Sequence, residues 1–314
     1  MVLRSFMENL LSEINTALTE RPEEFIAECE NNYIEQIKNA AARISQDDDI
    51  KIVAISGPSA SGKTTTAQIL CNELELSGET TAVVSLDDFY LPKEKLPVLP
   101  DGSLDLETVN SLDIPLIKQC FGEIIESGKT MLPTYDFMLD ARTACARTLD
   151  IGDRGIVVVE GLHALNPVIT SLVPRKNIFN IYISVNKSVT DDEGNTVLTS
   201  RQIRLIRRAL RDETFRGSPI SETLSLWSGV VANEEKYLYC FKPETDVALV
   251  TFHPYEPAFY KKRFTEMAKQ VTPDMPNSEY FFRAAEGLER FVELESHLVP
   301  KSSLIREFIG QDED

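Results

Sequence analysis

The sequence lacks the features that mark secreted, zinc-binding or membrane-spanning proteins. Its five cysteines are widely spaced and form no C-x-x-C pair, which argues against a zinc site and indicates reduced thiols. It contains no run of eighteen apolar residues, so no transmembrane helix is expected. The first apolar stretch is interrupted by Glu8 and Glu13 and has no small-residue cleavage site, so no signal peptide is expected. These absences together predict a cytoplasmic protein.

Positive charge is also scarce. The chain has 32 lysines and arginines against 50 aspartates and glutamates, a formal net charge of −18. Such a surface repels nucleic acids and anionic membranes, so neither is expected as a partner. A small molecule that carries phosphate would therefore need a locally positive site.

Short apolar segments alternate with helical patterns along the chain. Because strands that alternate with helices form parallel sheets covered on both faces, the pattern predicts an α/β fold with three layers. The predicted strands are rich in β-branched residues and occupy 51–56, 81–85, 155–160, 178–185 and 246–252. Helices are predicted over 64–77 and over most of 107–127.

The two ends of the chain read as helical additions to this α/β domain. Apolar residues recur at helical spacing before residue 46, and an aspartate run at 47–49 breaks the pattern. We expect a helical extension over 1–48, the main domain over 49–270 and a helical segment over 271–314. A homo-oligomer contact through the N-terminal helices is left open.

A phosphate-binding loop is the strongest signal. Residues 57–64 fit G-x-x-x-x-G-K-[ST], directly after a predicted strand and directly before a predicted helix. The glycines let the backbone fold around an oxyanion, and the loop N–H groups and the helix N-terminus supply positive partial charge. Lys63 should reach the β- and γ-phosphates of ATP, and the Thr64 hydroxyl should bind Mg²⁺. The predicted ATP-binding residues of this loop are Gly57, Ser59, Ala60, Ser61, Gly62, Lys63, Thr64 and Thr65.

The loop alone does not separate kinases from other nucleotide-binding proteins. A GTPase would read guanine with N-K-x-D after a strand. The chain has Asn186, Lys187 and then Val189 where the aspartate is needed. This motif is therefore treated as a chance pair.

Carboxylates follow two of the predicted strands. Ligands of open parallel sheets bind at the carboxyl ends of strands, where a carboxylate can deprotonate an acceptor hydroxyl. Asp87 and Asp88 follow strand 81–85, and one of them should face the site while the other caps a turn. Glu160 closes strand 155–160 and suits Mg²⁺ or its bound water. Two turn aspartates and a solvated strand end are the structural alternatives.

Arginines gather in one segment of this acidic chain, and we predict a lid over about 200–218. Arginine forks bind phosphates bidentately, so a lid of this kind would neutralise charge and exclude water. A solvated basic face is the alternative. The arginines on one helical face are Arg204, Arg207, Arg208 and Arg211, and Arg216 follows closely.

These motifs together resemble the uridine kinase and phosphoribulokinase family of P-loop kinases, from about residue 51 to about residue 255. The stretches that carry the resemblance are GPSASGKTT at 57–65, SLDDFY at 85–90, PTYDF at 133–137, VEGLHALNP at 159–167 and RRALRDETFRG at 207–217. DGSLDLETVNSLDIP and ETLSLWSGVVANEEKY look closest to a nucleoside-kinase-like branch. In some bacteria that branch is fused to a threonyl-tRNA-synthetase-like region. The resemblance implies ATP- and Mg²⁺-dependent phosphorylation of a hydroxyl on a small molecule, a nucleoside above all.

The resemblance also implies residue roles. It selects Asp87 as the acceptor base, and it places Tyr90, Tyr135 and Phe137 at the nucleoside pocket. It implies that Glu160 lies on the magnesium side of the site. It implies that three lid arginines, Arg208, Arg211 and Arg216, contact phosphates and substrate. It also implies that four residues are catalytic: Lys63, Asp87, Arg208 and Arg211.

One departure leaves the acceptor open. Pyrimidine nucleoside kinases carry a base-reading histidine three residues beyond the Phe137 position, where this chain has Asp140. An ionised carboxylate accepts but does not donate, so it suits an amino group or sugar hydroxyls better than uracil O4. A kinase of the same fold with a sugar phosphate or another small alcohol as acceptor is the first rival. A nucleotide-binding regulator without transfer activity is the second.

Overall fold

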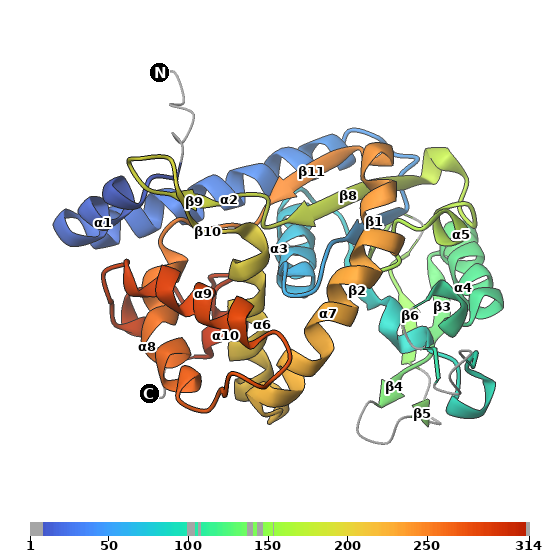
Figure 1. Ribbon diagram of the computed structural model, residues 1–314. Coiled ribbons are helices and arrows are strands. Elements are labelled where there is room, and N and C mark those ends of the chain that lie inside the picture. The colour runs from blue at the N-terminus through green and yellow to red at the C-terminus, as the bar shows by residue number, and fades with distance from the viewer. Residues whose placement is uncertain are drawn as a thin grey trace.

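The computed structural model describes residues 9–98, 104–105, 108–136, 141–142, 147–152 and 154–311, and it has an α/β fold. Five parallel strands form one sheet in the order β11-β8-β1-β7-β2 (Figure 1). All five predicted strands are confirmed. Their bounds are β1 Ile52–Ser56, β2 Thr81–Ser85, β7 Ile156–Glu160, β8 Ile178–Ser184 and β11 Val247–Val250.

The sheet register brings the ends of three strands together. Ile55 of β1 lies opposite Glu160 of β7, and Glu160 lies opposite Ser85 of β2. Because all strands are parallel, the segments that follow these residues emerge at one edge of the sheet. The phosphate-binding loop and both carboxylate segments therefore meet at that edge.

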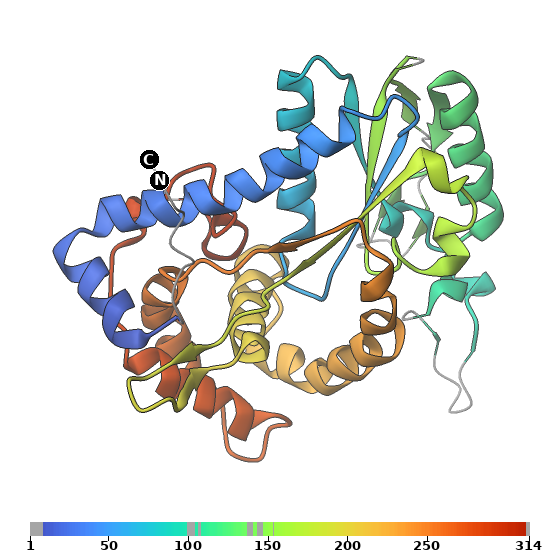
Figure 2. The same cartoon turned by 90° about the horizontal axis from the view of Figure 1, so that it is seen from above.

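Helices cover both faces of the sheet and give three layers (Figure 2). Val53 and Ile55 point into a core with α2 (Pro22–Ile44), α3 (Lys63–Leu76) and α6 (Ser200–Arg216). Ile52 and Ala54 point into a second core, and its helices are α4 (Ile114–Ser127) and α5 (Pro167–Thr170). Burial on both faces explains why the central strands are continuous runs of apolar residues.

Helix α4 is shorter than the sequence pattern predicted. It begins at Ile114 and not at residue 107, because the Asp113 carboxylate caps it by accepting a hydrogen bond from the backbone N–H of Leu116. A separate short 3-10 helix, Val109–Ser111, precedes it. The predicted helix over 64–77 is confirmed as α3.

Both ends of the chain pack into the core of the sheet. The N-terminal helices α1 (Leu11–Glu20) and α2 share one apolar cluster with β1 and β8. The C-terminal helices contribute to the same cluster, and they are α8 (Glu256–Ala268), α9 (Ser278–Glu289) and α10 (Arg306–Ile309). The proposed boundaries at residues 48 and 271 stay predictions, while the core is continuous across them.

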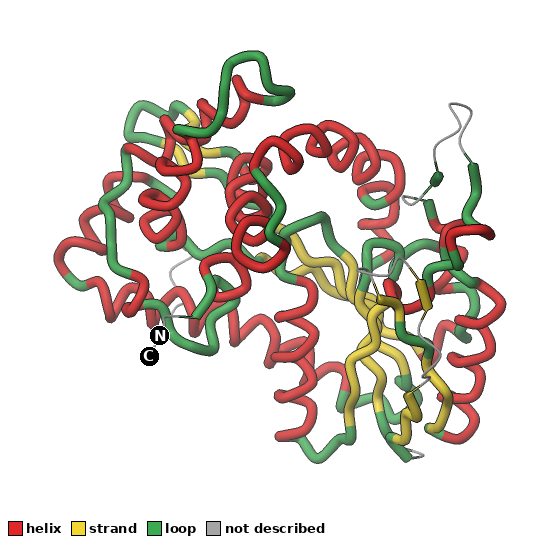
Figure 3. Tube along the Cα trace, turned by 90° about the horizontal axis from the view of Figure 1, so that it is seen from below, coloured by secondary structure: helices red, strands yellow, loops and turns green. Residues whose placement is uncertain are grey.

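Smaller elements complete the described part of the chain. Helix α7 (Ile220–Tyr237) follows α6, and Figure 3 shows the sheet strands on one side of the molecule and a largely helical region on the other. None of the described helices is both long and apolar enough to cross a membrane. Three antiparallel strand pairs lie outside the main sheet: β3 Lys129–Leu132 with β6 Arg147–Asp150, β4 Tyr135–Asp136 with β5 Ala141–Arg142, and β9 Val189–Thr190 with β10 Thr196–Leu198.

The shared core predicts that the N-terminal helices stabilise the whole protein. Ile37 of α2 is fully buried, so Ile37→Ala should lower the free energy of unfolding by about 2–5 kcal/mol. Asn39→Ala, on the exposed side of the same helix, should change it by less than about 0.5 kcal/mol. Urea denaturation followed by circular dichroism measures both. Equal stability of the two variants would show that α2 is not part of the cooperative core.

Candidate active site

The phosphate-binding loop joins β1 to α3 and has the backbone geometry that its glycines predict. Gly62 has a φ of +87°, in the left-handed region that favours glycine, and Ala60 has a φ of +58°. A Cβ at Gly57 would lie 2.4 Å from the carbonyl oxygen of Ile183 in β8. The loop therefore turns tightly between the sheet and the N-terminus of α3, which is a ready site for an anion.

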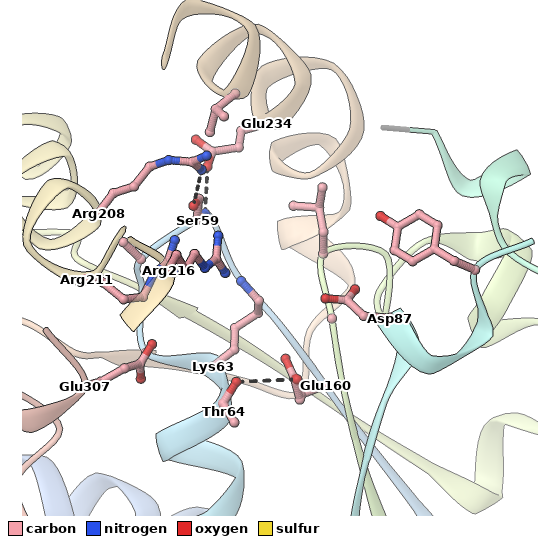
Figure 4. Close-up of a pocket in the computed structure, with 16 residues that line it drawn as sticks. Ser59, Lys63, Thr64, Asp87, Glu160, Arg208, Arg211, Arg216, Glu234 and Glu307 are labelled. Carbon is pink, nitrogen blue, oxygen red and sulfur yellow. Dashed lines mark hydrogen bonds between the residues drawn. The ribbon is translucent and has the colours of Figure 1, made fainter. Parts of the chain in front are cut away.

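Lys63 and Thr64, the first residues of α3, face two carboxylates. Lys63 Nζ donates to the carbonyl oxygens of Gly57 and Pro58 at 3.0 and 3.3 Å. Burial lowers the Lys63 pKa, while the charges of Glu160 and Asp87 oppose that change. Figure 4 shows Lys63 and Thr64 on one side of the pocket and Asp87 on the other.

The structure separates the two adjacent aspartates. Asp87 lies on the short 3-10 helix Leu86–Phe89 and lines the pocket, open to its solvent. Desolvation by the pocket walls raises the pKa of Asp87, Lys63 counteracts this, and the charge of Asp88 adds to it. Asp88 points away: its carboxylate accepts the Tyr135 backbone N–H at 3.3 Å and lies 3.6 Å from Arg147.

Glu160 lies at the end of β7 with only 7% of its surface exposed. Its Oε1 accepts a hydrogen bond from Thr64 Oγ1 at 3.5 Å. Burial raises the pKa of Glu160, Lys63 opposes this and Asp87 adds to it. Within the described ranges no cluster of three His, Cys, Asp or Glu residues could hold a metal. One hydroxyl and one carboxylate nevertheless fit Mg²⁺, which takes few protein ligands and completes its shell with water and phosphate oxygens.

Two of the arginines that the sequence placed on the lid face are buried supports of the loop. Arg204 Nε donates to the carbonyl oxygen of Ser59 at 2.9 Å, and its fork pairs with Glu234. Arg207 is fully buried and donates to the carbonyl oxygen of Ala60 at 3.3 Å. These two residues therefore do not line the cavity, because the loop and the core cover them.

The other three arginines line the pocket and share one buried carboxylate. Asp212 lies 3.3 Å from Arg208, 2.8 Å from Arg211 and 3.5 Å from Arg216. Arg208 also donates to the Ser59 hydroxyl at 2.9 Å. Asp212 thus gathers three guanidinium groups around the phosphate-binding loop. Asp212 lies within the motif that contains these arginines, but nothing in the sequence pattern indicates its role.

The cavity at this edge of the sheet has a volume of about 290 Å³ and collects most of the predicted residues. Those that line it are Ser59, Ala60, Gly62, Lys63, Thr64, Asp87, Tyr90, Glu160, Arg208, Arg211 and Arg216. Of the other predicted residues, Gly57, Ser61 and Thr65 belong to the loop or its helix without lining the cavity, and Phe137 and Asp140 lie outside the described residues.

Tyr135 packs against Tyr90 and does not itself line the cavity. The two rings are 5.8 Å apart between centroids. Arg142 holds this segment, because its Nε donates to the carbonyl oxygen of Tyr90 at 3.0 Å and its Nη2 donates to that of Phe89 at 3.1 Å. The wall that carries Asp87 and Tyr90 is thereby fixed from outside.

Sequence reasoning missed several lining residues, of which Glu234 makes the most direct loop contact. Its Oε1 accepts the Ser59 backbone N–H at 2.7 Å. This contact depends on α7 folding back over the loop, which no spacing in the sequence indicates. Val230 on the same helix also lines the cavity. The remaining unpredicted residues are Gly161, Leu162 and Glu307.

A family model described as "Phosphoribulokinase / Uridine kinase family" matches residues 52–253, more than half of the chain. The chain belongs to this family. The resemblance proposed from the motifs is confirmed at that level, and membership implies a kinase that uses ATP. Residues 9–51 and 254–311, which supply α1, α2 and α8–α10, lie outside the match.

Individual relatives of this kinase are distant. A uridine kinase of Lactobacillus helveticus is 27% identical over 181 residues, which cover 57% of this chain and 76% of the relative. A uridine kinase of Mycoplasma genitalium is also 27% identical, over 58% of this chain and 75% of its own. Among solved structures, a possible uridine kinase from Bacillus stearothermophilus aligns with a TM-score of 0.47 and 18% identity, covering 68% of this chain and 97% of its own.

The loop geometry yields a stability prediction. A Cβ at Gly62 would lie 2.4 Å from Leu304 Cδ1, whereas one at Gly78, where φ is also positive, would meet no atom within 4 Å. Gly78→Ala should therefore cost only the backbone strain, about 1–2 kcal/mol, and Gly62→Ala about 1–3 kcal/mol more.

A double-mutant cycle isolates the steric part of that cost. Gly62→Ala should destabilise less in a Leu304→Ala background, because truncation removes the clashing methyl group. Thermal or urea unfolding of the four proteins measures the coupling. Strict additivity would contradict the packing of Leu304 on the loop.

Proposed function

We propose that the protein transfers the γ-phosphate of ATP to a hydroxyl of a nucleoside or nucleoside-like small molecule. The observation that carries the proposal is the convergence of Lys63, Asp87 and Glu160 in one cavity at the end of the phosphate-binding loop. The pocket arginines add positive charge opposite Asp87. An otherwise acidic protein thus has a positive phosphate site with a carboxylate base across from it.

In the proposed reaction Asp87 accepts the proton of the acceptor hydroxyl as its oxygen attacks the γ-phosphorus in line. A new O–P bond forms, the bond to the β-phosphate oxygen breaks, and ADP leaves. Lys63, Arg208 and Arg211 stabilise the charge that develops on the transferring oxygens. Arg216 lines the same cavity as Arg211 and Asp87, so in this proposal its charge would also act on the transferring phosphate.

Thr64 and Glu160 would hold Mg²⁺ in this proposal. The ion, when bound, would neutralise part of the negative charge of the triphosphate. Glu160 suits this role because it is buried beside Thr64 with a raised pKa, and a cation would compensate the cost of its charge.

A nucleoside is our proposed acceptor, and within the family we place the chain nearest to the branch that in some bacteria is fused to a threonyl-tRNA-synthetase-like region. Distant relatives named uridine kinase support the acceptor class. Asp140 replaces the base-reading histidine, which favours an acceptor with an amino group or sugar hydroxyls over uridine. Arg216 lines the same cavity as Asp87, and its positive charge there favours a second candidate, an anionic acceptor such as a sugar phosphate.

An acceptor panel tests the function directly. ADP release from ATP and Mg²⁺ is measured with nucleosides, sugar phosphates and polyols. Turnover with a nucleoside, above all one with an amino group on its base, is the expected result. ATP binding without turnover by any acceptor would favour the regulator instead.

Substitution of Asp87 tests the base. Asp87→Asn should lower kcat by about 10²–10⁴-fold with little change in ATP affinity, because an amide cannot take the proton. Asp88→Asn is the matched control and should keep kcat within a few-fold at neutral pH, since Asp88 contacts Tyr135 and Arg147 and not the cavity. Equal decreases in kcat in the two variants would show that Asp87 is not the base.

The pH profile tests the electrostatics of the same residue. The pKa of Asp87 is raised above its ordinary value of 3.8, so the active base form is lost as the pH falls through that raised value. The acid limb of kcat/KM should therefore lie above pH 3.8. In Asp88→Asn it should move to lower pH, because a repulsive charge is removed. An acid limb that stays in place in Asp88→Asn would contradict this cause.

A further inference from the structure

The C-terminal helix α10 places a carboxylate at the first turn of the phosphate-binding helix. Thr65 Oγ1 donates a hydrogen bond to Glu307 Oε2 at 2.6 Å. Glu307 also lines the cavity, and Figure 4 shows it beside Arg211, across the pocket from Asp87. Its charge reaches Lys63 and Arg216. A residue at the far end of the chain thus forms one wall of the nucleotide site.

Packing fixes this wall in place. Leu304 lies directly against the loop glycine Gly62, where even a methyl group would clash. Phe308 is fully buried, with the Arg207 guanidinium 4.8 Å above its ring centroid. The Ser303 hydroxyl donates to Glu30 of α2 at 2.6 Å. Glu307 therefore sits on an anchored segment and not on a loose tail.

The order of groups along α3 indicates which part of a nucleotide Glu307 would meet. Lys63 and Thr64 serve the β- and γ-phosphates and the metal side, where Glu160 lies. Thr65 is the next hydroxyl along the helix, and because the α-phosphate is bound at the same loop, we place Thr65 on the α-phosphate side. Ribose is joined to the α-phosphate by one ester bond. The carboxylate of Glu307, which accepts the hydrogen bond of Thr65, is therefore expected on the ribose side of the cavity.

Hydrogen-bond chemistry selects the partner. An ionised carboxylate only accepts hydrogen bonds, and so do phosphate oxygens, so Glu307 repels phosphate unless it has a donor of its own. The donors nearest to an α-phosphate are the ribose hydroxyls. Carboxylates that accept from ribose hydroxyls are an established way to recognise nucleotides in α/β folds.

We propose that Glu307 is a specificity residue of the nucleotide site, whose carboxylate accepts hydrogen bonds from the ribose hydroxyls of the bound nucleoside triphosphate. The inference rests on the proposed function, because it needs the triphosphate to occupy the loop. Glu307 lies outside residues 52–253, so the family match does not supply this role. In this proposal, the choice of the nucleotide that donates the phosphate depends on a residue that lies beyond the matched domain.

Binding measurements on the full chain test the proposal. Dissociation constants are measured by calorimetry with Mg²⁺ for ATP, 2′-deoxy-ATP, 3′-deoxy-ATP and inorganic tripolyphosphate. The proteins are the wild type, Glu307→Gln, Glu307→Ala and the control Glu286→Gln, an exposed carboxylate of α9 that does not line the cavity. Thermal unfolding of each variant checks that it is folded.

The wild type should bind ATP about tenfold more tightly than at least one deoxy analogue, the size of one hydrogen bond to a charged group. Glu307→Ala should abolish this preference and Glu307→Gln should reduce it. Tripolyphosphate should bind both variants as tightly as the wild type or more tightly, because a negative charge is removed. Glu286→Gln should keep the full preference.

Two results would overturn the proposal in different ways. In the first, Glu307→Gln binds ATP and tripolyphosphate more tightly by the same factor, and the wild type shows no preference for ATP over the deoxy analogues. Glu307 would then compete with phosphate for the loop and would not contact ribose. Failure of the folded wild type to bind either ATP or tripolyphosphate would instead defeat the proposed function on which the inference rests.

Discussion

The site depends on the attachment of helix α6 to the backbone of the phosphate-binding loop. Arg204 and Arg207 donate to the carbonyl oxygens of Ser59 and Ala60, so two carbonyl groups of the loop are held by side chains of this helix. Arg207 is held in turn by Glu256 in a fully buried ion pair. Removing one partner of such a pair costs about 3–5 kcal/mol in proteins, so the helix and the loop are expected to behave as one rigid unit.

This attachment also organises the charges. Once Arg204 and Arg207 are committed to the loop, the next turns of α6 present Arg208, Arg211 and Arg216 to the cavity. A single buried carboxylate, Asp212, holds all three. A chain with a net charge of −18 therefore concentrates its positive charge where a polyphosphate would lie. Across the cavity, desolvation by the pocket walls keeps the pKa of Asp87 raised, as suits a base.

The two ends of the chain contribute to the same unit. On the N-terminal side the Tyr33 hydroxyl lies 2.7 Å from Thr66 Oγ1, which donates to the carbonyl oxygen of Gly62 at 2.6 Å. On the C-terminal side Leu304 packs on that glycine. The helices outside the family match are thus structural parts of the phosphate site, which explains why one apolar cluster runs through all of them.

The sequence by itself determined the sheet, the loop and the class of chemistry. Strands buried on both faces leave continuous apolar runs, and a loop that must wrap an anion needs glycines and a lysine at fixed spacing. These constraints act between neighbours in the chain, so Gly62, Lys63 and the five strands could be predicted. The start of α4 could not, because the Asp113 cap competes with the helical pattern before it.

Only the tertiary structure decided which side chains from distant segments line the cavity and which support it from outside. Asp87 and Asp88 are chemically identical neighbours, and the contact of Asp88 with Tyr135 sets them apart. Arg204 and Arg208 share one helical face, yet one is covered by the loop and the other lines the cavity. The carboxylate that accepts the hydrogen bond of Thr65 belongs to Glu307, which is 242 residues further along the chain. Contacts of this kind depend on how helices pack, and packing leaves no fixed spacing in the sequence.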